Sequence, residues 1–200
     1  MNNTKLAYLQ NVPALAEHGQ EFLYQIAEKS NLLTYRKGEM ILHRGHPNQW
    51  IGIICQGLVK AYENMDNKEE NFWAVFKEDD YCVCPFTFMK GSLSETNLEA
   101  LENTTILTIN LQDFAKIRAK YPRFEARVLQ VLSHRMMVLM KEKSLLLNMT
   151  AVERYEYFLQ SYPDMMQRLP LGHISKFLGI RQSSLSRIRR SLSQQRVQHN

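Results

Sequence analysis

The 200-residue chain has little cysteine and no long apolar segment. Its three cysteines, Cys55, Cys82 and Cys84, are too few for a disulfide framework or for a four-ligand iron–sulfur or zinc site. We expect them to be packing residues. No run approaches the roughly 18 apolar residues of a membrane span, and residues 1–5 do not resemble a signal peptide. These absences predict a soluble, cytoplasmic protein with no membrane partner.

Most of the chain also lacks an excess of charge of either sign. Residues 1–150 contain 17 basic and 17 acidic side chains, whereas residues 151–200 contain eight basic and three acidic ones. The whole net charge of +5 therefore lies in the last quarter, which indicates contact with a polyanion. The simpler alternative is a solvated basic tail, but regular apolar spacing accompanies the charge and favours a folded segment.

Short runs rich in β-branched and aromatic residues follow a helical pattern at residues 12–30. The runs are 32–35, 40–42, 50–54, 58–62, 71–76, 98–101 and 105–109. Turn signals such as Lys37-Gly38 and Gln56-Gly57 separate them. This spacing predicts a small antiparallel barrel or sandwich, and with the flanking helices an α+β protein.

A helical pattern returns at residues 111–121, and a long helix is predicted at about 124–148. Its steps of three and four define a candidate dimerisation seam of Leu129, Leu132, Met136, Leu139 and Leu146. Valines and Leu145 widen the apolar stripe, so we expect this helix to pack on the barrel and also to pair with a second copy. The alternative is a core helix that packs only within its own chain.

The last segment has the pattern of a helix-turn-helix. A helix at 151–169, ended by Tyr162-Pro163, precedes two short helices that meet at Gly179. Glycine suits this turn because it adopts a left-handed backbone conformation without the steric energy that a Cβ atom would add. Inward-facing side chains are predicted at Ile174, Phe177, Leu178, Ile180, Leu185, Ile188 and Leu192. The polar, arginine-rich second helix is then typical of one that enters the major groove of DNA.

The outward side chains of the second helix are the candidate DNA-binding residues. Glutamine pairs with adenine and arginine with guanine, so Gln182, Ser183, Ser186 and Arg187 are candidates for base edges. Arg181, Ser184 and Arg190 are better placed for phosphate oxygens.

This order of parts resembles the Crp–Fnr family, the catabolite-activator-like transcription regulators. The most specific segment is Ile174-Ser175-Lys176-Phe177-Leu178-Gly179-Ile180, running into Leu185-Ser186-Arg187-Ile188, and the supporting pieces are Lys37-Gly38-Glu39, Gly45, Gln56-Gly57-Leu58-Val59 and Glu153-Arg154. The resemblance implies a jelly-roll sensor domain at 1–122, a dimerisation helix at 123–149 and a DNA-binding domain at 150–200. It further implies a homodimer on a pseudo-palindromic operator in double-stranded DNA, acting with RNA polymerase, with Gln182, Ser183 and Arg187 reading bases.

Two departures from the family pattern alter these expectations. Members that bind cyclic AMP hold its phosphate with a short helix that opens in a Gly-Glu pair and with an arginine further along the chain. The acid position here is Cys84 and the arginine position is Ser94. Cyclic AMP would lack its bidentate partner, so we expect a less anionic or more apolar effector, or none, and no metal. The candidate effector pocket comprises Cys84, Pro85, Phe86, Lys90, Ser92, Ser94, Glu95, Leu139 and Met140. Only eight residues follow Leu192, so the usual wing is not expected and phosphate contacts should be fewer.

Two rival hypotheses remain. An enzyme of the cupin type would need several histidines and a carboxylate inside the barrel, and Glu39, His43 and His46 are the only candidates. We expect His18, His43 and His46 at the surface and no enzymatic activity. The second rival is a ligand-binding or protein-interaction module of the same fold that has lost specific DNA binding.

Overall fold

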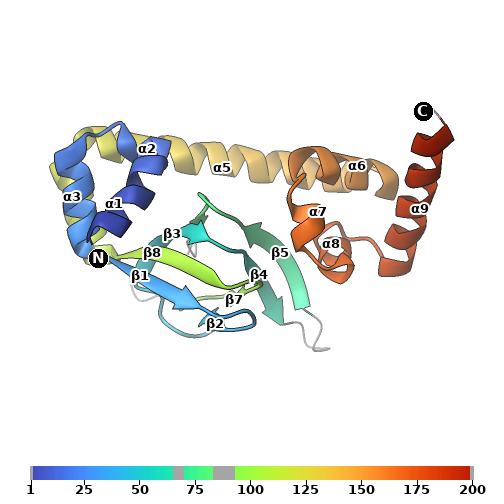
Figure 1. Ribbon diagram of the computed structural model, residues 1–200, viewed down its shortest axis with the longest axis horizontal. Helices are drawn as coiled ribbons and strands as arrows, with labels where there is room; N and C mark the ends of the chain where they lie inside the picture. The colour runs from blue at the N-terminus through green and yellow to red at the C-terminus, as the bar shows by residue number, and fades with distance from the viewer. Residues whose placement is uncertain (1, 65–69, 83–92, 199–200) are drawn as a thin grey trace. The chain divides into compact units, whose positions relative to one another are not determined.

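The computed structural model describes residues 2–64, 70–82 and 93–198 (Figure 1). The chain divides into two compact units, Met1–Leu132 and Ser133–Asn200. The first unit holds α1 (Asn2–Asn11), α2 (Pro13–Ala16), α3 (Gln20–Lys29), β1 (Ser30–Tyr35), β2 (Met40–Leu42), β3 (Trp50–Gln56), β4 (Val59–Asn64), β5 (Glu70–Phe76), β6 (Tyr81–Cys82), β7 (Asn97–Ala100), β8 (Thr104–Asn110) and α4 (Leu111–Lys120). The long helix α5 (Pro122–Asn148) contains the boundary between the units.

Two antiparallel four-stranded sheets form the barrel of the first unit. Their strand orders are β1-β8-β3-β6 and β2-β7-β4-β5, so all neighbouring strands except β4 and β5 are distant in sequence, as in a jelly roll. In the first sheet Ser30 pairs with Ile109 and Ile51 also pairs with Ile109, which places β8 between β1 and β3. The α+β class with an antiparallel jelly-roll barrel, predicted from the strand spacing, is confirmed.

Alternate residues of β8 face two different cores because side chains of a strand alternate between its faces. Ile106, fully buried, faces the space between the sheets together with Ile54 and Val59. Leu107, one residue later, faces the opposite side and packs against the helices, where Phe22 of α3 is fully buried. The first sheet is therefore covered by apolar side chains on both faces.

Helices α1, α2 and α3 group beside the start of α5 (Figure 1). Only Leu6 and Leu9 of α1 are buried apolar residues, and Lys5 is buried beside them at 6% exposure. The ammonium of Lys5 donates to the carbonyls of Ala27 and Ser30 at 3.1 and 2.5 Å. These carbonyls lie at the C-terminal end of α3, where helix carbonyls lack partners in their own helix and favour a cation.

The second unit is all-helical apart from its turns. It contains the end of α5 and α6 (Ala151–Ser161), α7 (Met165–Arg168), α8 (Leu171–Phe177) and α9 (Gln182–Gln198). A capping box begins α6: the Thr150 hydroxyl accepts from the Glu153 amide, and the Glu153 carboxylate accepts from the Thr150 amide. The core of this unit is small and includes Phe158, Ile174 and Leu185, each no more than 1% exposed.

Three predictions about the helices need correction. The helix expected at 12–30 is two helices, α2 and α3, because Gly19 between them has a φ of 85° that ends the helical path. The helix expected at 151–169 is likewise divided, into α6 and α7, at Pro163. The pattern also missed α1, whose apolar face is narrow. Within the described residues, no helix is long and apolar enough to cross a membrane.

Candidate functional site

The turn between α8 and α9 is closed by backbone hydrogen bonds and by one arginine. The amides of Gly179 and Ile180 donate to the carbonyls of Lys176 and Ser175 at 3.1 and 2.9 Å, and Gly179 has a φ of 61°. From α6, the guanidinium of Arg154 donates to the carbonyl of Leu178 at 2.8 Å. Arg154 therefore fixes the geometry of the turn, a positioning role that spacing alone did not reveal.

Helix α9 has an apolar side and an opposite polar side. Leu185 is fully buried, and Ile188 and Leu192 are partly buried. The predicted outward residues Arg181, Gln182, Ser183, Ser186, Arg187 and Arg190 are all exposed, whereas Ser184 is only partly exposed. Ser183, Arg187, Arg190 and also Gln194, which the sequence did not single out, recur at steps of four and three on the side opposite Leu185.

The charges of α9 have no counter-ions among the described residues. Arg181, Arg187, Arg189 and Arg190 form no ion pair with any carboxylate that the structure describes. The one side-chain contact in this group is a long hydrogen bond of 3.5 Å from Arg187 to the Ser184 hydroxyl. Unpaired, exposed guanidinium groups are suited to bind phosphate oxygens and base edges, and Arg187 and Arg190 share the side of α9 opposite Leu185.

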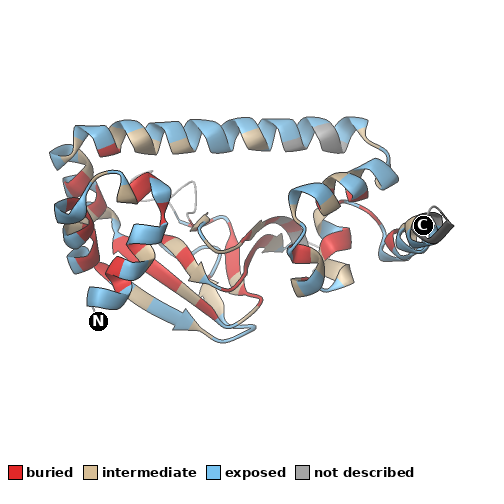
Figure 2. Ribbon diagram, turned by 45° about the horizontal axis from the view of Figure 1, so that its top comes forward, coloured by how far each residue is buried: buried red, intermediate tan, exposed pale blue. Residues whose placement is uncertain are grey.

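Most of α5 is exposed (Figure 2), and four of the five residues of the predicted dimerisation seam are among its exposed side chains. Leu129, Leu132, Met136 and Leu139 are 56%, 43%, 59% and 43% exposed, which is unusual for large apolar side chains on one helix stripe. The side chain of Leu146 lies outside the described part. Phe124, by contrast, is buried, and Val128 packs against the helical core of the first unit. One side of the start of α5 thus packs against the core of the first unit, whereas another side of the helix carries exposed leucines and methionines.

Several residues of the expected effector pocket lie outside the described residues: Cys84, Pro85, Phe86, Lys90 and Ser92. Ser94, which stands at the position of the family's phosphate-binding arginine, is 3% exposed. Its hydroxyl donates to the Thr96 carbonyl at 2.7 Å and accepts from the Thr96 amide, so it serves a turn. Glu95 is exposed. Leu139 and Met140 are exposed residues of the second unit.

The described core between the two sheets is apolar. It consists of Leu42, Ile54, Val59, Ala61, Ala74, Phe76, Cys82, Leu98 and Ile106. Lys60, between Val59 and Ala61, points to the opposite face of its sheet, where its ammonium lies 3.0 Å from carboxylate oxygens of Glu70 and Glu99. Burial alone would lower the pKa of Lys60, but hydrogen bonds with these two carboxylates outweigh it and raise the pKa. This ammonium is thus committed to an internal ion pair.

The surroundings of the described histidines and cysteines do not indicate a catalytic or metal-binding role. His18 was expected at the surface, but its side chain is only 8% exposed and packs between Phe22 and Phe124, so that prediction is wrong. His43 and His46 are exposed, with ring centroids 5.4 Å apart. Burial raises the pKa of the Cys55 thiol to about 11, which makes it a poor nucleophile near neutral pH. No cluster of three or more potential metal ligands occurs among the residues that the structure describes.

Comparison with known proteins identifies the class of the barrel. Residues 32–121 match the model of the cyclic nucleotide-binding domain family. No curated protein matches the chain in sequence. Among solved structures, FixK2 from Bradyrhizobium japonicum is 18% identical, with 83% of this chain and 85% of that chain covered and a TM-score of 0.73.

Two further solved structures extend this likeness. A CooA mutant from Carboxydothermus hydrogenoformans is 18% identical, with 92% of this chain and 85% of that chain covered and a TM-score of 0.73. The c-di-GMP-responsive global regulator CLP from Xanthomonas campestris is 14% identical, with 88% and 92% covered and a TM-score of 0.71. The chain therefore has a cyclic nucleotide-binding-type barrel within the fold of these regulators, and the resemblance to Crp–Fnr proteins seen in the sequence is confirmed at the level of the fold.

Proposed function

We propose that this protein is a homodimeric, sequence-specific DNA-binding transcription regulator of the cytoplasm. The observation that carries the proposal is the exposed face of α9, where the unpaired Arg187 and Arg190 lie opposite a buried Leu185. Gln182, Ser183 and Arg187 would read base edges in the major groove. Arg181, Ser184 and Arg190 would bind phosphates, and RNA polymerase is the expected further partner. In this proposal the sensor occupies residues 1–122, the dimerisation helix 123–149 and the DNA-binding domain 150–200.

The proposed effector is a small molecule other than cyclic AMP. Cyclic AMP carries a phosphate that needs a charge-assisted partner in a buried site. Ser94 stands where that arginine would be and its hydroxyl is bound to Thr96, while Lys60 is held by Glu70 and Glu99 on the outer face of its sheet. These contacts support an effector that is less anionic than a cyclic nucleotide, and no metal cofactor is proposed.

The proposal is tested by selecting bound fragments from a random duplex library and sequencing them. A dimer that presents two α9 helices should enrich an inverted repeat with half-sites one helical turn, about 34 Å, apart. Binding should weaken as salt rises, because each neutralised phosphate releases counterions. Absence of binding even at low salt would favour the rival of an interaction module without DNA binding.

The homodimer has a separate test in the double variant Met136→Glu/Leu139→Glu. Both side chains are exposed, so the chain should still fold, whereas paired carboxylates in an apolar seam should dissociate the dimer. Sedimentation equilibrium should report the mass of one chain for the variant and of two for the wild type. Gln130→Glu, exposed on the same helix, is the control that should leave the dimer intact. An unchanged mass for the double variant would remove this seam from the dimer.

A further inference from the structure

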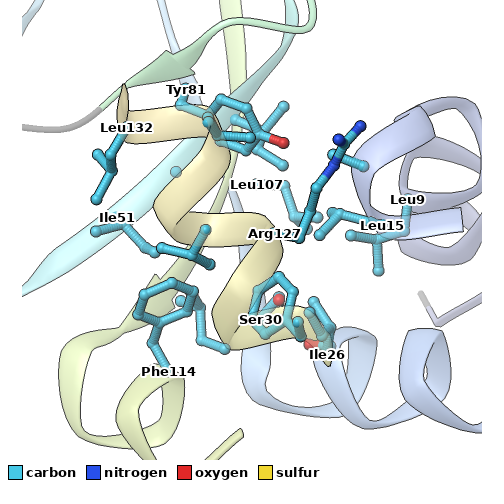
Figure 3. A pocket seen from close by; sticks show the side chains of 17 residues that line it. Leu9, Leu15, Ile26, Ser30, Ile51, Tyr81, Leu107, Phe114, Arg127 and Leu132 are labelled. Atoms are coloured by element: carbon cyan, nitrogen blue, oxygen red, sulfur yellow. Dashed lines mark hydrogen bonds between the residues drawn. The ribbon is translucent and has the colours of Figure 1, made fainter. Parts of the chain in front are cut away.

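A cavity lies outside the barrel, between the helix-covered face of the first sheet and the helices (Figure 3). The cavity has a volume of about 100 Å³ and is lined almost wholly by apolar side chains of the first unit. Its floor is the sheet, with Ile51 and Leu107, and its walls are α1 to α4 and the start of α5, with Leu15 and Phe114. It is thus separated by the sheet from the core that the barrel encloses.

Three polar side chains line this cavity, Ser30, Tyr81 and Arg127, and two of them are already engaged or turned outward. The Ser30 hydroxyl donates to the Ile26 carbonyl at 2.6 Å. The Arg127 guanidinium points away from Phe114 and Ile51 (Figure 3), and its Nε lies 3.1 Å from a Glu17 carboxylate oxygen. Water needs two to four polar partners to occupy a cavity, so this one favours an apolar occupant over water.

Helix α5 connects the cavity to the proposed dimer seam. Val128, Val131 and Leu132 line the cavity from α5. Leu132 is also 43% exposed and belongs to the stripe that includes Leu129. A molecule in the cavity therefore contacts the same helix turn that would meet a second copy, and binding there would change the free energy of pairing.

We propose that this cavity binds a small, neutral, apolar effector and that binding shifts the pairing of α5. Apolar cavities of about 150 Å³ stay dry and bind benzene or xenon, so the volume here selects a ligand of about that size or smaller. A carboxylate would be excluded because burying it without a partner is costly and Arg127 is already paired with Glu17. The effector role rests on the proposed function; the binding site itself does not.

Binding is tested with xenon and benzene as probes, followed by methyl NMR of the full chain. We expect saturable shifts at Leu107, Ile109 and Val128, which line the cavity, and none with benzoate. Val131→Phe fills the cavity and should raise the Kd for benzene at least tenfold. The control Val138→Phe lies outside the lining and should leave this Kd unchanged. No saturable shift, equal binding to Val131→Phe, or benzoate binding as tight as benzene would overturn the site.

The variant Leu107→Ala provides an independent test of the site in case Val131→Phe does not fold. It enlarges the cavity and should tighten benzene binding at least tenfold, and a Kd that does not tighten contradicts the proposed location. The effector role is tested by the dimer Kd with and without saturating benzene, where a change of at least threefold is expected. An unchanged dimer Kd overturns the coupling even if an inverted repeat is still enriched from the DNA library. Benzene binding without any enrichment would instead refute the proposed function and leave the cavity standing.

Discussion

The two units of this chain treat their charges in opposite ways. In the first unit, cations lie beside carboxylates: Lys60 bridges Glu70 and Glu99, and Arg118 binds Glu125. In the second unit, the described arginines of α9 have no such partner and face solvent. Residues 1–132 contain 14 basic and 16 acidic side chains, whereas residues 133–200 contain 11 basic and four acidic ones, so the excess of positive charge lies wholly in the second unit.

Under the proposed function, this difference assigns stability to the first unit and DNA recognition to the second. Paired charges and aromatic packing around Phe22 stabilise the first unit. The second unit has a small core around Leu185 and keeps its cations available. Substitutions in the first unit should change the free energy of unfolding, and substitutions on α9 should change DNA affinity.

The largest effect is expected from Phe22→Ala. Phe22 is fully buried and its ring centroid lies 4.8 Å from that of Phe124, so truncation should cost about 3–5 kcal/mol of unfolding free energy. Both tryptophans, Trp50 and Trp73, are in the first unit, so their fluorescence during urea unfolding reports on it alone. Tyr24→Ala, 57% exposed on the same helix, should be nearly neutral. Equal losses for the two variants would break the assignment of stability to this core.

Next in size is Lys5→Met. The change removes the donor to the Ala27 and Ser30 carbonyls and leaves them unsatisfied, which should cost about 1–3 kcal/mol. The same fluorescence-monitored urea unfolding measures the loss. Lys29→Met removes the same charge from an exposed position of α3 and should be close to neutral. A neutral Lys5→Met would show that the ammonium does not stabilise this corner.

The third prediction concerns the second unit and the variant Arg187→Ala. We expect a loss of about 1–3 kcal/mol of discrimination at one base pair, with unfolding unchanged because Arg187 is exposed. Competition binding with operator variants measures it. The matched control is Arg36→Ala, an exposed arginine of the first unit that should leave DNA affinity unchanged. Uniform weakening on all sequences would make Arg187 a phosphate contact.

Local patterns predicted much of this structure, and features that depend on distant parts were missed. Strand β2 has the bounds that were predicted, and the turn at Gly179 follows from its need for a positive φ. Strand β6 has two residues, too few for alternation to show. Helix α1 packs partly through the stem of Lys5, which a search for an apolar stripe does not find. The cavity behind α5 depends on side chains from both ends of the first unit, so no local spacing could predict it.

The smallest effect is expected from Glu153→Gln in the cap of α6. Hydrogen bonding to the Thr150 amide lowers the pKa of Glu153 below its ordinary 4.5. A lowered folded-state pKa contributes stability above pH 4.5 that is lost as pH falls through the folded value. The variant should therefore unfold at a slightly lower temperature than wild type at pH 7, and this difference, followed by far-ultraviolet circular dichroism, should shrink as the pH falls through the folded-state pKa. Glu156→Gln, exposed on the same helix but outside the cap, is the control that should unfold at the wild-type temperature at pH 7.

Lys5 also bears on the order in which the chain folds. Its two acceptors lie 22 and 25 residues along the chain, whereas Ser30, one of them, pairs through β1 with the far more distant Ile109. Short loops close at a lower entropic cost, so we expect α1 and α3 to assemble first and hold Ser30 as the starting point for the β1–β8 register. Pulse-labelled hydrogen exchange should then protect α3 amides before those of β8, and the reverse order would exclude this path.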